Sequence, residues 1–254
     1  MAPDEDRRAA RDGDRVVVVT GASRGLGRGC ALAFAGRGTE VVLLARGAAE
    51  LESVAGEVRE RGGGARVIEC DVTRDERVQQ AFASLGRCDV LINNAGMNQP
   101  QPFLDVDPAT LDALLTLNVR SMFVTAQAAA RLMARMRSGV IINMSSQMGH
   151  VGAARRTVYC MTKHAIEGLT KAMAVELAPL GIRVNSVAPT YIETPMTRPF
   201  FEDAGFRDDV LRRIPLGRTG TIEEVAAAVV FLASPAASLI TGASLLADGG
   251  YTAQ

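Results

Sequence analysis

The chain has 254 residues, of which 48% are hydrophobic and 22% charged, and its 28 basic and 28 acidic side chains leave no net charge. This composition is typical of a globular enzyme with a sizeable core and excludes a chain that is disordered throughout. With a pI near 6.8, the chain has no excess of positive charge with which to bind nucleic acid or an acidic membrane surface. The basic residues are nearly all arginine, because only Lys163 and Lys171 are lysines.

The chain shows no sign of export or of a membrane span. Residues 1–14 are charged throughout and are expected to form a disordered leader rather than a signal peptide. No run approaches the roughly 20 apolar residues of a transmembrane helix. Cys30, Cys70, Cys88 and Cys160 have no redox or metal-binding spacing, so we expect buried free thiols, a cytoplasmic protein and no metal site.

From Arg15 onward, short β-branched runs alternate with helix-length stretches, the pattern of βαβ units around a parallel sheet. No linker divides this region, so residues 15–254 are expected to form a single α/β domain with a doubly wound sheet. Long helices are expected over residues 108–137 and 155–178. The seven expected strands cover residues 15–20, 40–45, 66–70, 89–93, 139–145, 182–188 and 243–247.

A glycine-rich turn, Thr20 to Gly27 (TGASRGLG), joins the first strand to a helix rich in alanine and leucine. Glycine lets the backbone approach a pyrophosphate, and the start of a helix offers unpaired N–H groups to phosphate oxygens. Strand, turn and helix together predict a dinucleotide site. A turn that needs glycine only for steric reasons is the alternative.

The end of the second strand indicates which dinucleotide is bound. NAD sites usually place an acid there for the adenosine ribose, whereas NADP needs a cation for its 2′-phosphate. The chain has Ala45 followed by Arg46, and Arg24 within the turn could reach the same phosphate. We therefore expect NADP(H) in preference to NAD(H).

Tyr159 and Lys163 are four residues apart in a segment with helical periodicity, so their side chains should share one face. A nearby ammonium favours the phenolate and is expected to lower the tyrosine pKa toward neutrality, making the phenol a usable acid and base. The neighbouring His164 should point away from that face, since each residue turns about 100° along a helix.

Ser146 stands where the fifth strand ends, at the edge of the sheet where open α/β folds bind ligands. A hydroxyl there could donate a hydrogen bond to a substrate oxygen, and the neighbouring Ser145 competes for that role. His150 lies on the following loop and is a candidate substrate contact. Arg155 and Arg156 could attract an anionic substrate.

These motifs together resemble the short-chain dehydrogenase/reductase family, and the similarity extends from Arg15 to Tyr251. The family's TGxxxGxG motif is present from Thr20 to Gly27, and YxxxK from Tyr159 to Lys163. NNAG is present as Asn93 to Gly96, the strand-end serine as Ser146 and the C-terminal DGG as Asp248 to Gly250.

The resemblance implies a Rossmann fold and assigns four catalytic roles. Tyr159 would exchange the proton, Ser146 would polarise the carbonyl, and Lys163 would acidify the tyrosine and hold the nicotinamide ribose. Asn118 would help to position a water in the proton relay.

The resemblance also implies a set of coenzyme contacts. The family's PGxxxT motif appears from Pro189 to Thr194 with Thr190 in place of the usual glycine, which puts the local backbone shape in question. The coenzyme-binding residues expected from the turn, the strand ends and the resemblance are Gly21, Ser23, Arg24, Gly25, Leu26, Gly27, Arg46, Asp71, Val72, Asn94, Ala95, Gly96, Tyr159, Lys163, Pro189, Ile192 and Thr194.

We thus expect an NADP(H)-dependent oxidoreductase that moves a hydride between nicotinamide and a small carbonyl or secondary alcohol. A 3-oxoacyl-reductase-like or carbonyl reductase leads, a sugar-acid or polyol dehydrogenase is the alternative, and a catalytically silent NADP-binding sensor or scaffold is more remote. Residues 190–216 carry prolines and aromatics after a strand and are expected to form a substrate lid. The resemblance implies a homotetramer, and neither nucleic acid nor membrane is an expected partner.

Overall fold

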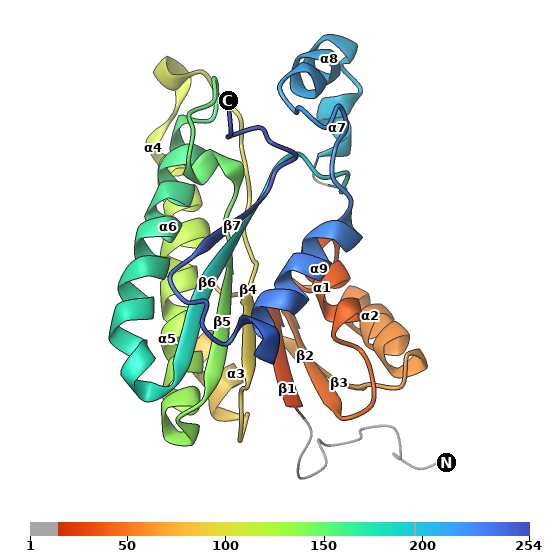
Figure 1. Cartoon of the computed structure of the whole chain (residues 1–254), viewed down its shortest axis with the longest axis vertical. Helices are drawn as coiled ribbons and strands as arrows, with labels where there is room; N and C mark the ends of the chain where they lie inside the picture. Colours follow the sequence, from red (N-terminus) through yellow and green to blue (C-terminus); the bar gives the residue numbers. More distant parts are fainter. Residues whose placement is uncertain (1–14, 196) are drawn as a thin grey trace.

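The computed structural model describes residues 15–195 and 197–254, without the side chains of residues 199 and 200. The predicted leader, residues 1–14, lies outside the described residues. Within them, seven parallel strands form one sheet in the order β3-β2-β1-β4-β5-β6-β7 (Figure 1). The strands are β1 (Arg15–Thr20), β2 (Thr39–Ala45), β3 (Gly64–Glu69), β4 (Val90–Asn93), β5 (Gly139–Met144), β6 (Ile182–Pro189) and β7 (Ser244–Ala247).

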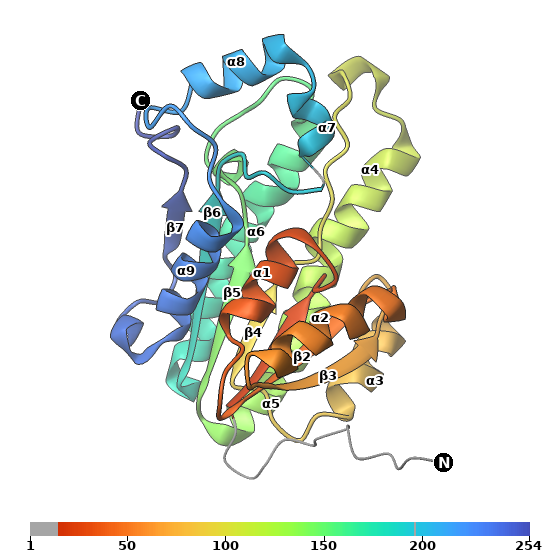
Figure 2. The same ribbon diagram turned by 90° about the vertical axis from the view of Figure 1, so that its right-hand side faces the viewer.

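Helices cover both faces of this sheet, as Figures 1 and 2 show. One face carries α1 (Gly25–Ala33), α2 (Ala48–Glu60) and α9 (Ile222–Ala233), and the other carries α3 (Asp75–Ala83), α5 (Ser121–Met136) and α6 (Thr157–Leu177). Shorter helical elements are η1 (Phe103–Asp105), α4 (Pro108–Leu115), η2 (Thr116–Arg120), η3 (Gln147–Gly149), η4 (Ala178–Leu180), α7 (Arg198–Phe201), α8 (Ala204–Arg212) and η5 (Pro235–Ala237). The predicted doubly wound Rossmann fold is therefore confirmed.

The four valines of β1 explain why this strand lies at the centre of the sheet. Val17 and Val19 belong to the apolar core under α1, α2 and α9, whereas Val16 and Val18 belong to the core under α3, α5 and α6. A strand buried on both faces needs such a continuous apolar run. Between its neighbours β2 and β4, the strand order reverses, which places a ligand crevice at the carboxyl end of β1.

The predicted strands agree with the observed ones to within two residues at each end. The helix predicted over residues 108–137 is interrupted, because a π-helical turn, η2, separates α4 from α5. A π turn inserts an extra residue into the helical hydrogen-bond ladder and often marks a functional site. All four cysteines are buried and free, as expected.

The segment after β6 forms α7 and α8, which lie beyond the carboxyl ends of the strands at the top of Figure 1. Tyr191, Phe201 and Phe206 make an aromatic cluster there, with ring centroids 5.8 to 6.1 Å apart. The Arg156 guanidinium lies 5.9 Å from the centroid of the Phe206 ring and so connects this segment to the start of α6. No helix in the described part of the chain is long and apolar enough to cross a membrane.

Candidate active site

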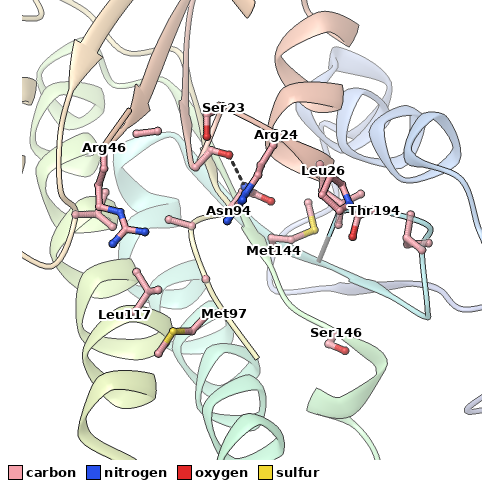
Figure 3. A pocket seen from close by; sticks show the side chains of 18 of the residues that line it. Ser23, Arg24, Leu26, Arg46, Asn94, Met97, Leu117, Met144, Ser146 and Thr194 are labelled. Carbon is pink, nitrogen blue, oxygen red and sulfur yellow. Dashed lines mark hydrogen bonds between the residues drawn. The ribbon is translucent and has the colours of Figure 1, made fainter. Parts of the chain in front are cut away.

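A cavity of about 570 Å³ opens at the carboxyl ends of the central strands, and most of the predicted site residues line it. Ser23 and Arg24 lie at its wall in the turn before α1, Arg46 at the end of β2, and Ser146 at the opposite end (Figure 3). Of the predicted site residues, Gly27 and Asn118 are the exceptions that do not line it. The other lining residues are Ala45, Gly47, Glu50, Cys70, Thr73, Met97, Leu117, Met144, Ser145, Thr190, Pro195 and Thr197.

The glycine-rich turn is shaped by backbone angles that favour glycine. Gly21 has φ of 65° and Gly25 has φ of 56°. The following helix α1 has no side-chain cap at Arg24 and no acid in its first turn, so its first N–H groups and its positive dipole end are free for an anion. Because Gly25 and Leu26 also line the cavity, these N–H groups are placed for a phosphate.

Gly27 supports the site without lining it. A Cβ atom at Gly27 would lie 2.2 Å from the Gly21 carbonyl oxygen and 2.6 Å from Asn94 Nδ2. The residue must therefore be glycine for α1 to pack against the turn. Its predicted contact with the coenzyme becomes a role in packing.

Hydrogen bonds lock the turn to the loop after β4. The buried Thr20 hydroxyl accepts from the backbone N–H groups of Asn94 at 2.9 Å and Ala95 at 3.0 Å. In return, Asn94 Nδ2 donates to the Thr20 carbonyl oxygen at 2.9 Å. The sequence motifs TGxxxGxG and NNAG thus form one rigid wall of the cavity.

Charged side chains of both signs line the cavity near its coenzyme end. Arg46 follows β2 and Arg24 lies in the turn before α1, and Glu50 from the first turn of α2 is an acid that the sequence analysis did not predict. At the end of β3, burial disfavours the charged form of Asp71, but hydrogen bonds from Thr73 outweigh this and lower the Asp71 pKa. That carboxylate is therefore held rigidly at the cavity wall.

Ser146, Tyr159 and Lys163 meet at the other end of the cavity. Tyr159 and Lys163 extend from one face of α6, with Lys163 Nζ 5.5 Å from the centroid of the tyrosine ring. The Ser146 hydroxyl is close enough to the Tyr159 phenol to act on its pKa, which it lowers. Ser145 also lines the cavity, but its hydroxyl has no hydrogen-bond partner among the described residues. This arrangement favours Ser146 over Ser145 as the hydroxyl that acts with the tyrosine.

The prediction that the Tyr159 pKa is lowered is wrong: the groups of the protein itself raise this pKa. Burial raises it to about 12, against smaller lowering effects from the Ser146 hydroxyl and the charge of Arg156. Burial also lowers the pKa of Lys163 to about 8, while the charge of Glu167 acts in the opposite direction. The lysine ammonium donates to the Met144 carbonyl oxygen at 2.8 Å. Burial therefore outweighs the attraction between ammonium and phenolate.

Asn118 lies in the π turn η2 and is fully buried behind the cavity. Its Nδ2 donates to the Met97 carbonyl oxygen at 2.8 Å and to Thr162 Oγ1 at 3.3 Å, and its Oδ1 accepts from the Met97 N–H at 2.8 Å. The side chain thus ties the loop after β4 to the catalytic helix α6. Its amide is fully engaged in holding these elements.

The two histidines face away from the cavity. His164 Nδ1 lies 2.9 Å from the Cys160 carbonyl oxygen on the exposed side of α6, as the helical geometry predicts. His150 Nε2 lies 2.9 Å from Ser244 Oγ, so the structure does not support it as a substrate contact. Arg155 is exposed, whereas Arg156 is buried beside the aromatic cluster.

Thr190 does not strain the backbone where the related motif has glycine. Its φ is not positive, and its N–H donates to the Ala247 carbonyl oxygen of β7 at 3.1 Å. Further along, Thr197 Oγ1 accepts from the Thr194 N–H at 3.0 Å and fixes the chain where it borders the cavity. The departure from the motif is accommodated by extension of the sheet hydrogen bonding.

A family model described as enoyl-(acyl carrier protein) reductase matches residues 21–252. The chain belongs to the short-chain dehydrogenase/reductase family. This result confirms the resemblance carried by the sequence motifs. Members of this family are oxidoreductases that act on alcohol and carbonyl groups, and this chain is one of them.

Relatives within the short-chain dehydrogenase/reductase family span nearly the whole chain. L-xylulose reductase from Bos taurus is 40% identical over 240 residues, which cover 94% of this chain and 97% of the relative. A 3-oxoacyl-[acyl-carrier-protein] reductase from Thermotoga maritima is 38% identical and covers 93% and 97%. The crystal structure of a gluconate 5-dehydrogenase from Burkholderia cenocepacia, in complex with NADP and tartrate, is 34% identical, has a TM-score of 0.91 and covers 98% of both chains.

Proposed function

We propose that the protein is an NADP(H)-dependent reductase of small carbonyl compounds, acting in reverse as an alcohol dehydrogenase. The observation that carries this proposal is a single cavity with the uncapped start of α1 at one end and a Ser146, Tyr159 and Lys163 cluster at the other end. One end suits the phosphates of a dinucleotide, and the other suits the reacting oxygen of a substrate.

The residues of the turn fit a pyrophosphate, because the first N–H groups of α1 lack any side-chain cap and face the cavity. Asp71, Val72 and the loop from Asn94 to Gly96 would hold the adenosine, and Lys163 the nicotinamide ribose. The other predicted lining residues would complete the contacts, with Ile192 and Thr194 at the carboxamide. When bound, the coenzyme supplies the hydride.

Tyr159 serves as the proton donor in this proposal. Its raised pKa keeps the phenol protonated at neutral pH, which is the form that reduction of a carbonyl requires. Ser146 donates a hydrogen bond to the same substrate oxygen and orients the phenol. Asn118 holds α6 and the loop after β4 in register, and so preserves the position of Tyr159.

The preference for NADP(H) over NAD(H) rests on Arg24 in the turn before α1 and Arg46 at the end of β2, which both line the cavity. Two guanidinium groups suit a 2′-phosphate, which accepts charge-assisted hydrogen bonds from them. Glu50 lies at the same rim and does not follow β2 directly, as the acid of an NAD site usually does. A gluconate 5-dehydrogenase of similar fold binds NADP, which agrees with this proposal.

We propose a polyhydroxylated substrate, such as a keto sugar or a keto sugar acid, rather than a 3-oxoacyl thioester. Among the described residues, Ser145 Oγ and Thr190 Oγ1 belong to residues of the cavity wall and are buried without a hydrogen-bond partner. Each such buried group costs about 1–3 kcal/mol when left unsatisfied. Substrate hydroxyls would satisfy them, whereas an acyl chain would not.

Relatives support a polar substrate by their names, since one is an L-xylulose reductase and another a gluconate 5-dehydrogenase. The test is oxidation of NADPH by keto sugars and keto sugar acids, compared with 3-oxoacyl thioesters at equal concentrations. A higher kcat/KM for the thioesters would favour the 3-oxoacyl reductase instead.

The segment 190–216 is proposed to be a substrate lid, with α7 and α8 as its helices. The Tyr191, Phe201 and Phe206 cluster gives it a small core of its own, and Arg156 packs that core against the catalytic helix. The lid would then exclude water from the carbonyl while Tyr159 donates its proton.

We also propose a homotetramer, because six of the exposed large apolar side chains of the described residues belong to two sets of elements. Phe123, Met161 and Val175 project from α5 and α6, whereas Phe231, Leu239 and Leu246 lie on or near α9 and β7. Two distinct surfaces are what a tetramer with twofold symmetries requires. Light scattering should give a mass four times the 26.8 kDa of the chain. A monomeric mass at micromolar concentration would overturn the proposal.

A cytoplasmic location is proposed on the state of the cysteines. All four are free, and burial raises the pKa of Cys30 to about 12 and that of Cys70 to about 11. Buried thiols held in their protonated form are unreactive, and they suit a compartment where disulfides do not form.

A further inference from the structure

Glu167 is a buried carboxylate on the catalytic face of α6, and the proposed reaction does not use it. It follows Lys163 by four residues, as Lys163 follows Tyr159, so the three side chains lie in one row along the helix. Only 6% of Glu167 is exposed. Ser186 of β6 donates to its Oε2 at 2.8 Å.

The second oxygen of Glu167 is buried close to His150. Oε1 has no hydrogen bond among the described residues, although His150 Nε2 lies 3.4 Å from it. A Cβ atom at Gly149 would lie 2.9 Å from Ser145 Oγ and 3.1 Å from Glu167 Cγ. Gly149 therefore leaves room for a carboxylate beneath the catalytic cluster, where a larger residue would displace it.

A buried carboxylate at this position suggests a function, because burying an unpaired charge costs folding free energy. Ser186 donates a hydrogen bond to Oε2, whereas Oε1 has only the His150 imidazole nearby, at 3.4 Å. A leucine would fill the same space without this cost. The remaining effect of the carboxylate is its charge, which acts on Lys163.

Lys163 is the group that this charge influences. The ammonium is 96% buried at a place where desolvation favours the neutral amine and lowers its pKa to about 8. Glu167 is the charged group that raises this pKa again. Of the described groups around Lys163, Tyr159 and Glu167 come from α6 and His150 follows η3, while β5 and β6 contribute the Met144 carbonyl and Ser186.

We propose that Glu167 is a positioning residue that keeps Lys163 in its ammonium form, and that Ser186 and His150 hold the carboxylate in place for this purpose. The proposal rests on the function proposed for Lys163 in holding the ribose and supporting Tyr159. His150 lies beyond Glu167 toward the surface, and its Nε2 is 2.9 Å from Ser244 Oγ of β7.

The scarcity of lysine makes a direct test possible. Lys163 and Lys171 are the chain's two lysines, so the protein labelled with ¹³C at lysine Cε gives two side-chain NMR signals. Lys171 follows Glu167 by four residues but is exposed, so solvent screens it from that charge and its signal serves as the internal reference. A Lys171→Arg variant assigns the signals.

Glu167→Gln removes the charge and preserves the shape. We expect the Lys163 signal to titrate about one pH unit lower than in the wild type, because loss of the anion disfavours the ammonium. The control is Glu176→Gln, an exposed glutamate on the same helix, which should leave Lys163 unchanged. Glu167→Asp should restore part of the shift.

The pH profile of kcat/KM gives a second readout. The alkaline limb should move to lower pH by the same amount in Glu167→Gln, with kcat near pH 6 nearly unchanged. Unchanged titration of Lys163 in Glu167→Gln would overturn the proposal. If Glu167→Gln fails to fold, Ser186→Ala and His150→Gln take its place. Each should lower the pH at which the Lys163 signal titrates, by less than is expected for Glu167→Gln. No shift in either variant would also overturn the proposal. Because the NMR titration needs no turnover, it separates this proposal from the proposed reaction.

Discussion

Replacing Tyr159 with phenylalanine is expected to lower kcat by about a thousandfold while the dissociation constant of NADPH changes by less than about threefold. The phenol is the acid that the proposed reaction needs, and it lies with Ser146 at the catalytic end of the cavity. The ring remains, so the wall of the coenzyme cavity keeps its shape. Stopped-flow turnover and fluorescence titration with NADPH measure the two quantities separately.

Tyr251→Phe is the matched control for this variant. Tyr251 does not line the cavity, and it interacts with Arg213 near the C-terminus. Its kcat should stay within about twofold of the wild type, since substitutions away from such sites have small effects. Turnover that survives in Tyr159→Phe would show that Tyr159 is not the proton donor and would make Ser146 the next candidate.

The second large effect is expected at the coenzyme phosphates. Changing Arg24 and Arg46 together to alanine should weaken NADPH binding by about a hundredfold or more, because each charge-assisted hydrogen bond contributes about 1.5–3 kcal/mol. The affinity for NADH should change by less than about threefold, since NADH carries no 2′-phosphate. Isothermal titration of both coenzymes against both proteins measures the change in preference.

Arg37→Ala supplies the control, because Arg37 is exposed on the loop before β2 and does not line the cavity. It should bind both coenzymes as the wild type does. A wild-type protein that binds NADH more tightly than NADPH would contradict the assigned coenzyme. Equal weakening of both coenzymes in the double variant would show that the two arginines act on the shared pyrophosphate.

Local patterns account for most of what could be predicted from the sequence. The valine run of β1, the glycine-rich turn and the four-residue spacing of Tyr159 and Lys163 each depend on residues close together in the chain. For that reason the fold, the cavity and the cluster at its catalytic end follow from them. Two predicted site residues do not line the cavity: Gly27 packs α1 against the turn, and Asn118 is buried behind the cavity.

Features that depend on distant residues could not be predicted in this way. The pKa of Tyr159 was expected to fall because its helical neighbour is a lysine, but burial by several elements outweighs that one charge. His150 was a candidate substrate contact, but its imidazole lies against Ser244, 94 positions away, and does not line the cavity. The interruption of the helix at Asn118 likewise depends on contacts with Met97 and Thr162, which helical periodicity does not reveal.

The buried row of Tyr159, Lys163 and Glu167 combines a local pattern with contacts to distant residues. Its four-residue spacing is visible in the sequence, but the contacts of the Glu167 carboxylate with Ser186 and His150 are visible only in the structure. Lysine is rare in this chain, and Lys163 is the lysine that the fold buries. A compact ammonium fits beside a phenol and a carboxylate where a planar guanidinium would not.

The central claim is that Tyr159, Ser146 and Lys163 reduce a carbonyl group at the expense of NADPH. The most direct measurement follows the absorbance of NADPH as the purified protein meets a panel of keto sugars, keto sugar acids and 3-oxoacyl thioesters, with Tyr159→Phe in parallel. We predict that at least one keto sugar or keto sugar acid oxidises NADPH with kcat on the order of 1 per second or higher, and that the variant loses this turnover. Tight binding of NADPH without oxidation by any member of the panel would contradict the account and indicate a coenzyme-binding protein without catalysis.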